Sequence, residues 1–232
     1  MITIADWIVA AGTVVMAIVA IVAIFQDKIR VWLTHPKLEG AIATTSPDCI
    51  KITLLAKTLQ QEKVPVDTYY LRIRIKNEGN EKAENVEVFA AELSKRQADG
   101  VTFKRVDDFE PMNLVWTNFG GTIFFPAISP RMYKFCDIAH IMNPAQRANN
   151  IYAEDKHWPG IPLEKTILSF DTFVKPHTLS YLHPFGTYRL VIVVAATNAK
   201  PGTITLEIAL TGDWYDDASR MLGEGVTIRV VK

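Results

Sequence analysis

The sequence predicts a mainly β protein: an antiparallel, immunoglobulin-like β-sandwich with long insertions, preceded by one N-terminal transmembrane α-helix. Two observations support this prediction. One unbroken apolar run of 19 residues lies near the N-terminus, and after residue 38 apolar and polar residues alternate in short segments separated by turn residues. We therefore divide the chain into an anchor, residues 1–38, and a sandwich domain, residues 39–232.

The composition excludes several classes of protein. The 232 residues include 25 Lys and Arg against 25 Asp and Glu, and 49% are hydrophobic. A neutral chain lacks the basic surplus that binds phosphates, so we expect no nucleic-acid partner. Two cysteines cannot build a disulfide-rich scaffold. We expect Cys49 and Cys136 to be buried thiols in a cytoplasmic domain, or one disulfide in an outward-facing one.

The apolar run, Trp7–Phe25, contains no charged residue, and only Gly12 and Thr13 lie outside the apolar set. At about 1.5 Å per residue it forms a helix of roughly 28 Å, close to the thickness of the hydrocarbon core of a bilayer. A buried core helix, the alternative, is normally shorter or interrupted by polar residues. The preceding residues contain no base, unlike a cleavable signal peptide, so we expect the helix to be retained.

The charges that flank this helix predict its orientation in the cell membrane. Only Asp6 precedes the helix, whereas Lys28, Arg30 and Lys37 follow it, and positive charge stays cytoplasmic. We expect the N-terminus outside and the C-terminal domain in the cytoplasm. The helix should end before Pro36. Four residues are candidates for the membrane interface: Trp7, Lys28, Arg30 and Trp32.

A seam of small residues follows one side of the apolar run. Its members are Ala10, Thr13, Ala17 and Ala20, at spacings of three, four and three residues. Small side chains let membrane helices approach closely, so the seam predicts a homo-oligomer formed through this helix. The alternative is that alanine is simply frequent in membrane helices.

Period-two alternation predicts the strands of the sandwich. Tyr69–Asn77 and Asn85–Ala91 alternate on either side of an Asn-Glu-Gly turn, and we expect them to form a hairpin. Gly186–Thr197 is apolar on both faces in its middle, which predicts a central strand covered on both sides and paired with Thr203–Thr211. Further strands are expected at Glu39–Thr45, Cys49–Leu55 and Val226–Val231. The sequence leaves open one enlarged sandwich or two packed ones.

Two stretches carry a resemblance to a known family. YYLRIRIKNEGNEKAENVEV, residues 69–88, resembles the strand, turn and strand of bacterial immunoglobulin-like domains of the cell-adhesion-related (CARDB) group. GTYRLVIVVAATNAKPGTITLEI, residues 186–208, is similar to the closing hairpin of such domains. The whole layout resembles uncharacterised single-pass prokaryotic membrane proteins. The resemblance implies a β-sandwich fold and brings no catalytic residue.

No catalytic motif supports an enzyme, because the chain has no G-x-S-x-G, Walker-type, H-E-x-x-H, C-x-x-C or G-x-G-x-x-G motif. We expect no enzymatic activity, no cofactor and no metal. Two weaker groups of ligand-type residues remain: Asp213, Asp216 and Asp217, and His157, His177 and His183. The aspartates could hold Ca²⁺, but capping and turn roles are favoured. The histidines lie too far apart along a strand for one metal and are expected on surface loops.

A basic row lies on one face of the strand predicted at Tyr69–Asn77. Its members are Tyr70, Arg72, Arg74 and Lys76. The row is a candidate binding site for a phosphorylated or nucleotide ligand, or for anionic headgroups. The favoured alternative is a solvated strand face that Glu84 and Glu87 neutralise from the partner strand of the hairpin.

Three functions follow from this sequence. The leading hypothesis is a non-enzymatic interaction or scaffold module, anchored in the bilayer, that binds an unidentified protein partner at the cytoplasmic face. The second is a sensor that binds a small anionic ligand at the basic row and acts through helix oligomerisation, which resembles membrane-attached effectors of prokaryotic defence systems in layout. The third is an outward-facing module that binds carbohydrate or matrix through Trp116, Trp158 and Trp214.

Overall fold

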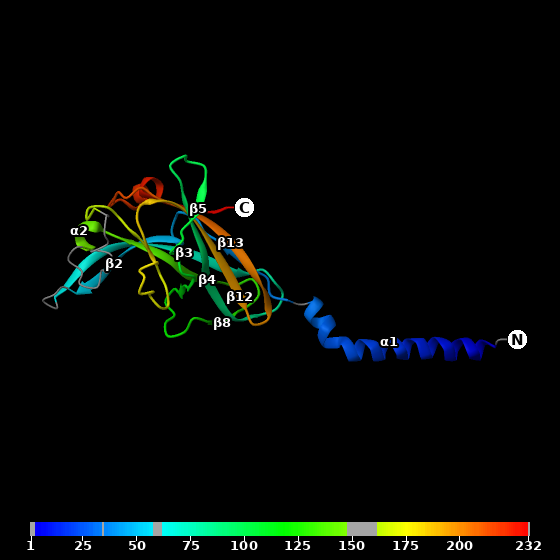
Figure 1. Ribbon diagram of the computed structural model, residues 1–232. Helices are drawn as coiled ribbons and strands as arrows, with labels where there is room; N and C mark the ends of the chain where they lie inside the picture. Colours follow the sequence, from blue (N-terminus) through cyan, green and yellow to red (C-terminus); the bar gives the residue numbers. More distant parts are fainter. Residues whose placement is uncertain (1–2, 34, 58–61, 148–161, 232) are drawn as a thin grey trace.

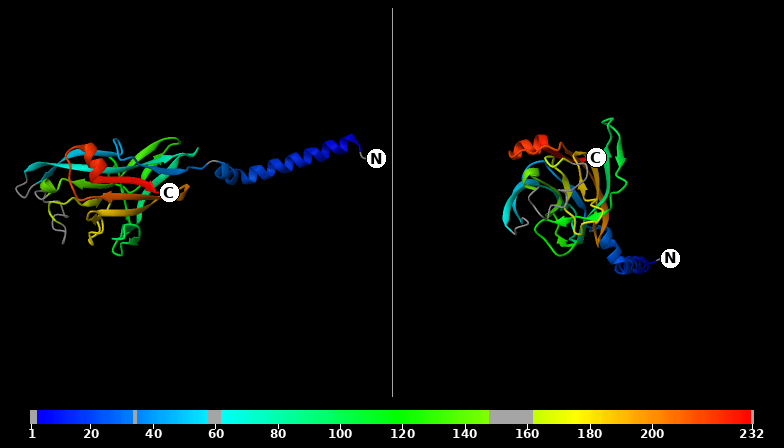
Figure 2. Two further views of the ribbon diagram at one scale, coloured as in Figure 1. Left: turned by 90° about the horizontal axis from the view of Figure 1, so that it is seen from above. Right: turned by 60° about the vertical axis from the view of Figure 1, so that its left-hand side comes forward.

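The computed structural model describes residues 3–33, 35–57, 62–147 and 162–231. A long helix, α1 (Ile4–Leu33), projects from one end of a β-sandwich, and all views agree on this arrangement (Figures 1 and 2). The segment Ile4–Gln26 of α1 is long and apolar enough to span a membrane, and no part of it is buried against the sandwich. The helix ends at Leu33, before Pro36, as expected.

Two antiparallel sheets, each of seven strands within the described residues, form the sandwich. The first sheet contains β1 (Leu38–Ala41), β2 (Cys49–Lys57), β3 (Lys63–Asn77), β7 (Val115–Trp116), β9 (Tyr133–Met142), β10 (Leu168–Phe170) and β11 (Leu182–His183). The second contains β4 (Ala83–Arg96), β5 (Phe103–Arg105), β6 (Met112–Asn113), β8 (Phe125–Ile128), β12 (Gly186–Ala196), β13 (Ala199–Leu210) and β14 (Val226–Val231). Short helices α2 (Pro144–Arg147) and α3 (Ala218–Arg220) and a π-helical turn, η2 (Met221–Gly225), complete the fold.

One hydrophobic core lies between the two sheets. Alternate residues of β3, including Leu71 and Ile73, and alternate residues of β12, including Leu190 and Ile192, are fully buried in the same cluster. Each buried aliphatic side chain contributes about 1.5–3 kcal/mol of burial free energy. Because all buried apolar residues of the described chain except Ala56 and Val66 belong to one cluster, the domain is a single enlarged sandwich.

The closing hairpin is confirmed, but one detail of its prediction was wrong. β12 pairs with β13 from Gly186 opposite Leu210 onward, and β14 adds to the free edge of β13. β12 is central within its sheet, yet Val191 and Val193 on its outer face remain partly exposed. Only one other sheet packs on it, so its outer apolar residues have no covering layer.

The hairpin predicted from Tyr69–Asn77 and Asn85–Ala91 was wrong. β3 pairs with β1 and β2 on one edge and with β9 on the other, whereas β4 pairs with β12 in the second sheet. The turn between β3 and β4 therefore crosses from one sheet to the other. Alternation shows that a segment has one buried face, but it does not show which strand lies beside it.

The same turn holds the chain that follows α1. The backbone N–H of His35 donates to Asn80 Oδ1 at 3.1 Å, and the N–H of Lys37 donates to Asn77 Oδ1 at 3.1 Å. In return, the N–H of Glu78 donates to the carbonyl of Lys37 at 2.7 Å. We call these segments, residues 35–37 and 77–80, the joint. The joint fixes the sandwich close to the end of the apolar helix.

The two cysteines are buried free thiols on opposite sides of β3. Cys49 lies opposite Leu71 from β2, and Cys136 lies opposite Ile73 from β9. Because β3 lies between β2 and β9, the two cysteines are separated by two strand spacings, about 10 Å. A disulfide requires Cα atoms no more than about 7 Å apart. The alternative of one disulfide is therefore excluded by the sheet. Burial raises the pKa of Cys49 to about 12 and that of Cys136 well above its usual value, so both are poor nucleophiles.

Candidate functional site

The predicted basic row lies on the outer face of the first sheet, partly exposed, as alternation implies. Its charges, however, are matched by nearby carboxylates. Arg74 Nη2 lies 3.0 Å from Asp48 Oδ2, whose side chain is almost fully buried. Lys76 Nζ lies 2.5 Å from Glu78 Oε1. An anion that arrived at the row would have to displace these acids.

Arg72 is also engaged within the protein. Its guanidinium stacks on the Phe135 ring, 4.8 Å from the centroid, and donates a hydrogen bond to the carbonyl of Pro47. The neutralised face is the alternative favoured from the sequence, but the partners expected there were wrong. Glu84 and Glu87 lie on β4 in the other sheet, where Glu84 pairs with Lys82 and Glu87 accepts from Asn113.

A polar cluster continues from Tyr70 across β9. The Tyr70 ring lies 5.5 Å from the ring of His140, and His140 Nδ1 lies 2.8 Å from Asp171 Oδ1. Asp137 accepts a hydrogen bond from Thr117 Oγ1 at 2.5 Å. Burial raises the pKa of Asp137 to about 6, with the Thr117 hydrogen bond opposing the rise and the charge of Asp171 adding to it.

Asp137 therefore makes the protein less stable at neutral pH than in mild acid. Its folded pKa lies above its unfolded value, so its stabilising effect is complete below about pH 4 and is lost as the pH rises through 6. We expect Asp137→Asn to raise the free energy of unfolding by about 2 kcal/mol at pH 7.5 and by almost nothing near pH 4. Denaturant titrations of both proteins at the two pH values test this; an equal difference at both would contradict it.

The wild-type pH profile alone does not isolate Asp137. Burial lowers the pKa of His183 to about 4, against the opposing hydrogen bond to the Ser180 carbonyl. Protonation of this buried histidine in acid lowers the free energy of unfolding. Above about pH 6.5 the histidine is neutral in both states, and this loss is absent. The two groups therefore act in opposite directions between pH 4 and 6.5, and only the difference between variant and wild type separates them.

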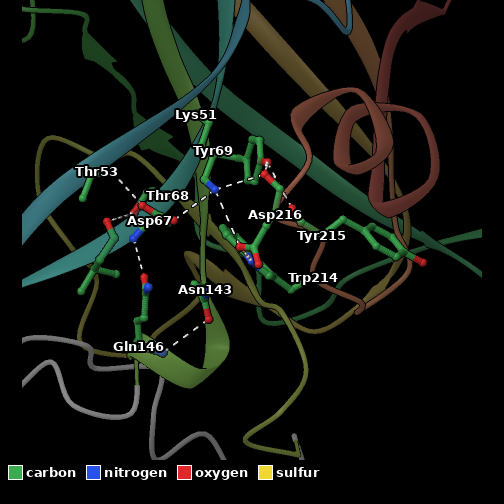
Figure 3. Close-up of polar contacts among 11 residues, drawn as sticks. Lys51, Thr53, Asp67, Thr68, Tyr69, Asn143, Gln146, Trp214, Tyr215 and Asp216 are labelled. Atoms are coloured by element: carbon green, nitrogen blue, oxygen red, sulfur yellow. Dashed lines mark hydrogen bonds and ion pairs between the residues drawn. The ribbon is translucent and has the colours of Figure 1, made fainter.

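The aspartate group around residue 213 takes structural roles. Asp213 pairs with Lys165 at 2.7 Å, and Asp217 caps α3 by accepting from the N–H of Arg220. Asp216 accepts from Trp214 Nε1 at 2.9 Å and lies 3.7 Å from Lys51 Nζ (Figure 3). The three carboxylates turn to different partners. Within the described residues, no three His, Cys, Asp or Glu side chains form a group that could hold a metal ion.

Lys51 attaches this loop to the first sheet. Its ammonium lies 3.0 Å from Asp67 Oδ2, and Asp67 also accepts from Thr53 Oγ1 at 2.7 Å (Figure 3). The Tyr69 hydroxyl donates to the carbonyl of Tyr215 at 3.1 Å, beneath the Trp214 ring. Beside this attachment, a hollow of about 650 Å³ lies between residues 44–51 and 218–223. Among the described residues that line it, Lys51 alone carries a charge, and its ammonium already pairs with Asp67.

Other predicted site residues are placed differently from the expectation. His183 is buried rather than on the surface, because it packs against Phe170 and Tyr188 and its Nε2 lies 2.9 Å from the Ser180 carbonyl. Trp116 is also buried, and Trp214 packs on Tyr69, so these two indoles present no exposed aromatic platform. Two residues of these predictions, His157 and Trp158, lie outside the described residues.

The residues predicted for the membrane interface and the seam belong to α1. Trp7 and the seam residues are exposed along α1, and Thr13 Oγ1 donates to the carbonyl of Val9. The seam residues are Ala10, Thr13, Ala17 and Ala20. The interface candidates Lys28, Arg30 and Trp32 belong to α1, but their side chains lie outside the described part of the structure.

A second basic surface, which the sequence did not reveal, lies on the outer face of the second sheet. Pairing aligns Arg105 with Ser94, Ser94 with Arg189, Arg189 with Glu207 and Glu207 with Arg229. Directly opposed residues share one face of a sheet. Arg96 follows two residues after Ser94 on the same face. We call Arg96, Arg105, Arg189 and Arg229 the arginine stripe.

Glu207 lies at the centre of the arginine stripe with only 7% of its side chain exposed. Its carboxylate meets Arg229 Nη2 at 2.6 Å, Arg189 Nε at 3.2 Å and Arg96 Nη2 at 3.2 Å. Burial alone would raise the pKa of Glu207, but the hydrogen bonds from Arg229 and Arg189 and the charge of Arg96 outweigh it and lower the pKa. Three guanidinium groups thus contact one carboxylate.

No protein-family model matches the chain, and no curated protein is found as a relative.

Proposed function

We propose that this protein is a single-pass membrane protein whose sandwich serves as a non-enzymatic interaction or scaffold module at the cytoplasmic face of the cell membrane. The observation that carries the proposal is the joint, in which three hydrogen bonds, two of them accepted by side chains, hold residues 35–37 to the sandwich shortly after an exposed apolar helix. A module held in this way presents one defined surface at one defined place above a bilayer. The flanking bases Lys28, Arg30 and Lys37 favour the cytoplasmic side.

A binding role is supported by how the candidate polar groups are used. The carboxylates near residue 213 cap a helix or pair with lysines, and the basic row is occupied by Asp48 and Glu78. Large outer sheet faces and free strand edges offer binding surface without a reactive group. The CARDB-like resemblance of residues 69–88 and 186–208 is part of this proposal.

A sensor of a small anionic ligand at the basic row is less well supported, because Arg72, Arg74 and Lys76 already have partners. Homo-oligomerisation through the seam is compatible with either function, since the seam residues are exposed on α1. The third hypothesis, carbohydrate or matrix binding outside the cell, is less well supported, because Trp116 is buried and Trp214 packs on Tyr69.

Two engineered cysteines test the anchoring and its orientation. Val101, 80% exposed at the tip between β4 and β5, and Ile4, 81% exposed at the start of α1, are each replaced by Cys. The buried native thiols should give little background with an impermeant maleimide. We expect Val101→Cys to react only after cell lysis and Ile4→Cys to react in intact cells. The reverse pattern would overturn the orientation, and recovery of the protein in the soluble fraction would overturn the anchor.

A further inference from the structure

We infer that the arginine stripe is the docking site of an acidic segment of a protein partner. This inference deepens the proposed function by naming the surface and the chemistry of the partner. It begins from Arg96, Arg189 and Arg229, which contact the buried carboxylate of Glu207, and from Arg105, which lies on the same face at the sheet edge.

The guanidinium groups have more donors than Glu207 can accept. Each guanidinium offers five N–H donors, whereas an ionised carboxylate accepts at about four lone-pair positions. The Arg229 side chain is 73% exposed and that of Arg189 is 42% exposed, so their remaining donors are open to a ligand. Arg105, exposed at the sheet edge, makes no ion pair within the described chain. Arg96 Nε is buried and has no hydrogen-bond partner among the described residues.

The arginines are also held in place before any partner arrives. The Arg189 guanidinium lies 3.9 Å from the centroid of the Phe103 ring, and that of Arg96 lies 5.1 Å from it. Stacking and the shared bonds to Glu207 fix the planes of both groups. A preorganised guanidinium loses less conformational entropy on binding a carboxylate than a mobile side chain does.

The shape of the arginine stripe fits a polypeptide better than a small anion. Arg105, Arg189 and Arg229 lie on β5, β12 and β14, each two strands from the next. With about 4.8 Å between strands, neighbouring members of this set are about 10 Å apart, and the arginine stripe is about 19 Å long. Neither described hollow, one beside η2 and one beside β6, is lined by any of these arginines. An open arginine stripe of this length can pair with several carboxylates along one acidic segment.

The position of the arginine stripe argues against the lipid surface as its ligand. Ser94 is the residue of β4 that lies between Arg105 and Arg189 of the arginine stripe. It is eleven residues along the strand from Ala83, which lies next to the joint. This separation is about 35 Å along the strand, several times the Debye length of about 8 Å at physiological salt. Headgroups next to α1 therefore act only weakly on these arginines.

A matched pair of charge reversals tests the docking site. Arg105→Glu changes the outer face of the second sheet, whereas Lys104→Glu makes the same charge change at the next residue of β5, which points to the opposite side of the strand. Full-length protein in nanodiscs of uncharged lipid is titrated with a fluorescein-labelled peptide of alternating Glu and Ser, read by anisotropy. A peptide with Gln in place of Glu measures binding that does not depend on charge.

We expect the Glu peptide to bind the wild-type protein with a strong salt dependence. Arg105→Glu should weaken the affinity for this peptide about tenfold, and Lys104→Glu should weaken it less than about twofold. Thermal unfolding checks that both variants fold. If Arg105→Glu does not fold, Arg229→Gln takes its place in the test. Equal losses for both charge reversals would overturn the proposal. No binding to the Glu peptide, with binding to nanodiscs of anionic lipid or to an oligonucleotide instead, would also overturn it. The assay does not depend on orientation in the cell, so its failure is distinct from a failure of the topology test.

Discussion

Replacing Asn77 with alanine is expected to lower the free energy of unfolding by about 3 kcal/mol and to release the chain that follows α1. The Asn77 side chain is fully buried and makes hydrogen bonds in two directions. Its Nδ2 donates to the carbonyls of Glu81 at 2.7 Å and Ile128 at 2.9 Å, and its Oδ1 accepts from the N–H groups of Lys37 and Gly79. Alanine leaves these backbone groups without that partner in a place where water has little access.

Two measurements check the Asn77 variant. Denaturant unfolding in detergent gives the stability, and trypsin cleavage after Lys37 reports release of the joint. Asn113→Ala is the matched control, because Asn113 donates one side-chain bond, to Glu87, from a partly exposed position. We expect the control to cost less than about 1 kcal/mol and to leave Lys37 protected. Equal effects of the two substitutions would show that Asn77 has no special role.

Gly79→Ala is expected to detach the joint while leaving the core of the sandwich intact. A Cβ atom on Gly79 would lie 2.3 Å from the carbonyl oxygen of His35, 2.5 Å from the nitrogen of Lys37 and 2.7 Å from Cα of Pro36. All three are backbone atoms, so no side chain can rotate away, and the chain after α1 must move. We expect trypsin cleavage after Lys37 to increase at least about tenfold, the change that a loss of about 1.4 kcal/mol in docking free energy produces.

Gly120→Ala is the matched control for this substitution, because a Cβ atom there meets nothing within 4 Å. Its cleavage rate and unfolding midpoint should equal those of wild type. A Gly79→Ala protein with wild-type protection at Lys37 would contradict the close contact between the turn and the chain after α1. Comparison with Asn77→Ala separates the joint from the sandwich, since only Asn77 also bonds to Ile128.

The strands of this fold could be predicted because their signal is local. Leu71, Ile73 and Ile75 alternate with polar residues, and the structure buries these three while leaving their neighbours partly exposed. The partner of each strand is a non-local property, and the hairpin prediction failed for that reason. The Asn-Glu-Gly sequence did indicate a turn, but the buried bonds of Asn77 to Ile128 and Lys37 direct the chain across to the second sheet.

The candidate sites show the same limit. The basic row could be read from the sequence because its members alternate along one strand, but its neutralising partner Asp48 lies in a loop before β2. The arginine stripe could not be read at all, because Arg96 and Arg229 are far apart in the chain and meet only through the register of four strands. A charge total near zero for the chain conceals a local surplus of this kind.

The length of β4 sets a minimum on any partner that is anchored beside this protein in the same bilayer. Its acidic segment must cover the distance from the joint to the arginine stripe, about 35 Å along the strand. An extended chain advances at most about 3.3–3.6 Å per residue. About ten residues must therefore separate the membrane-spanning part of such a partner from its first acidic side chain. With β4 along the bilayer normal, a shorter tail would not reach the arginine stripe, whatever its charge.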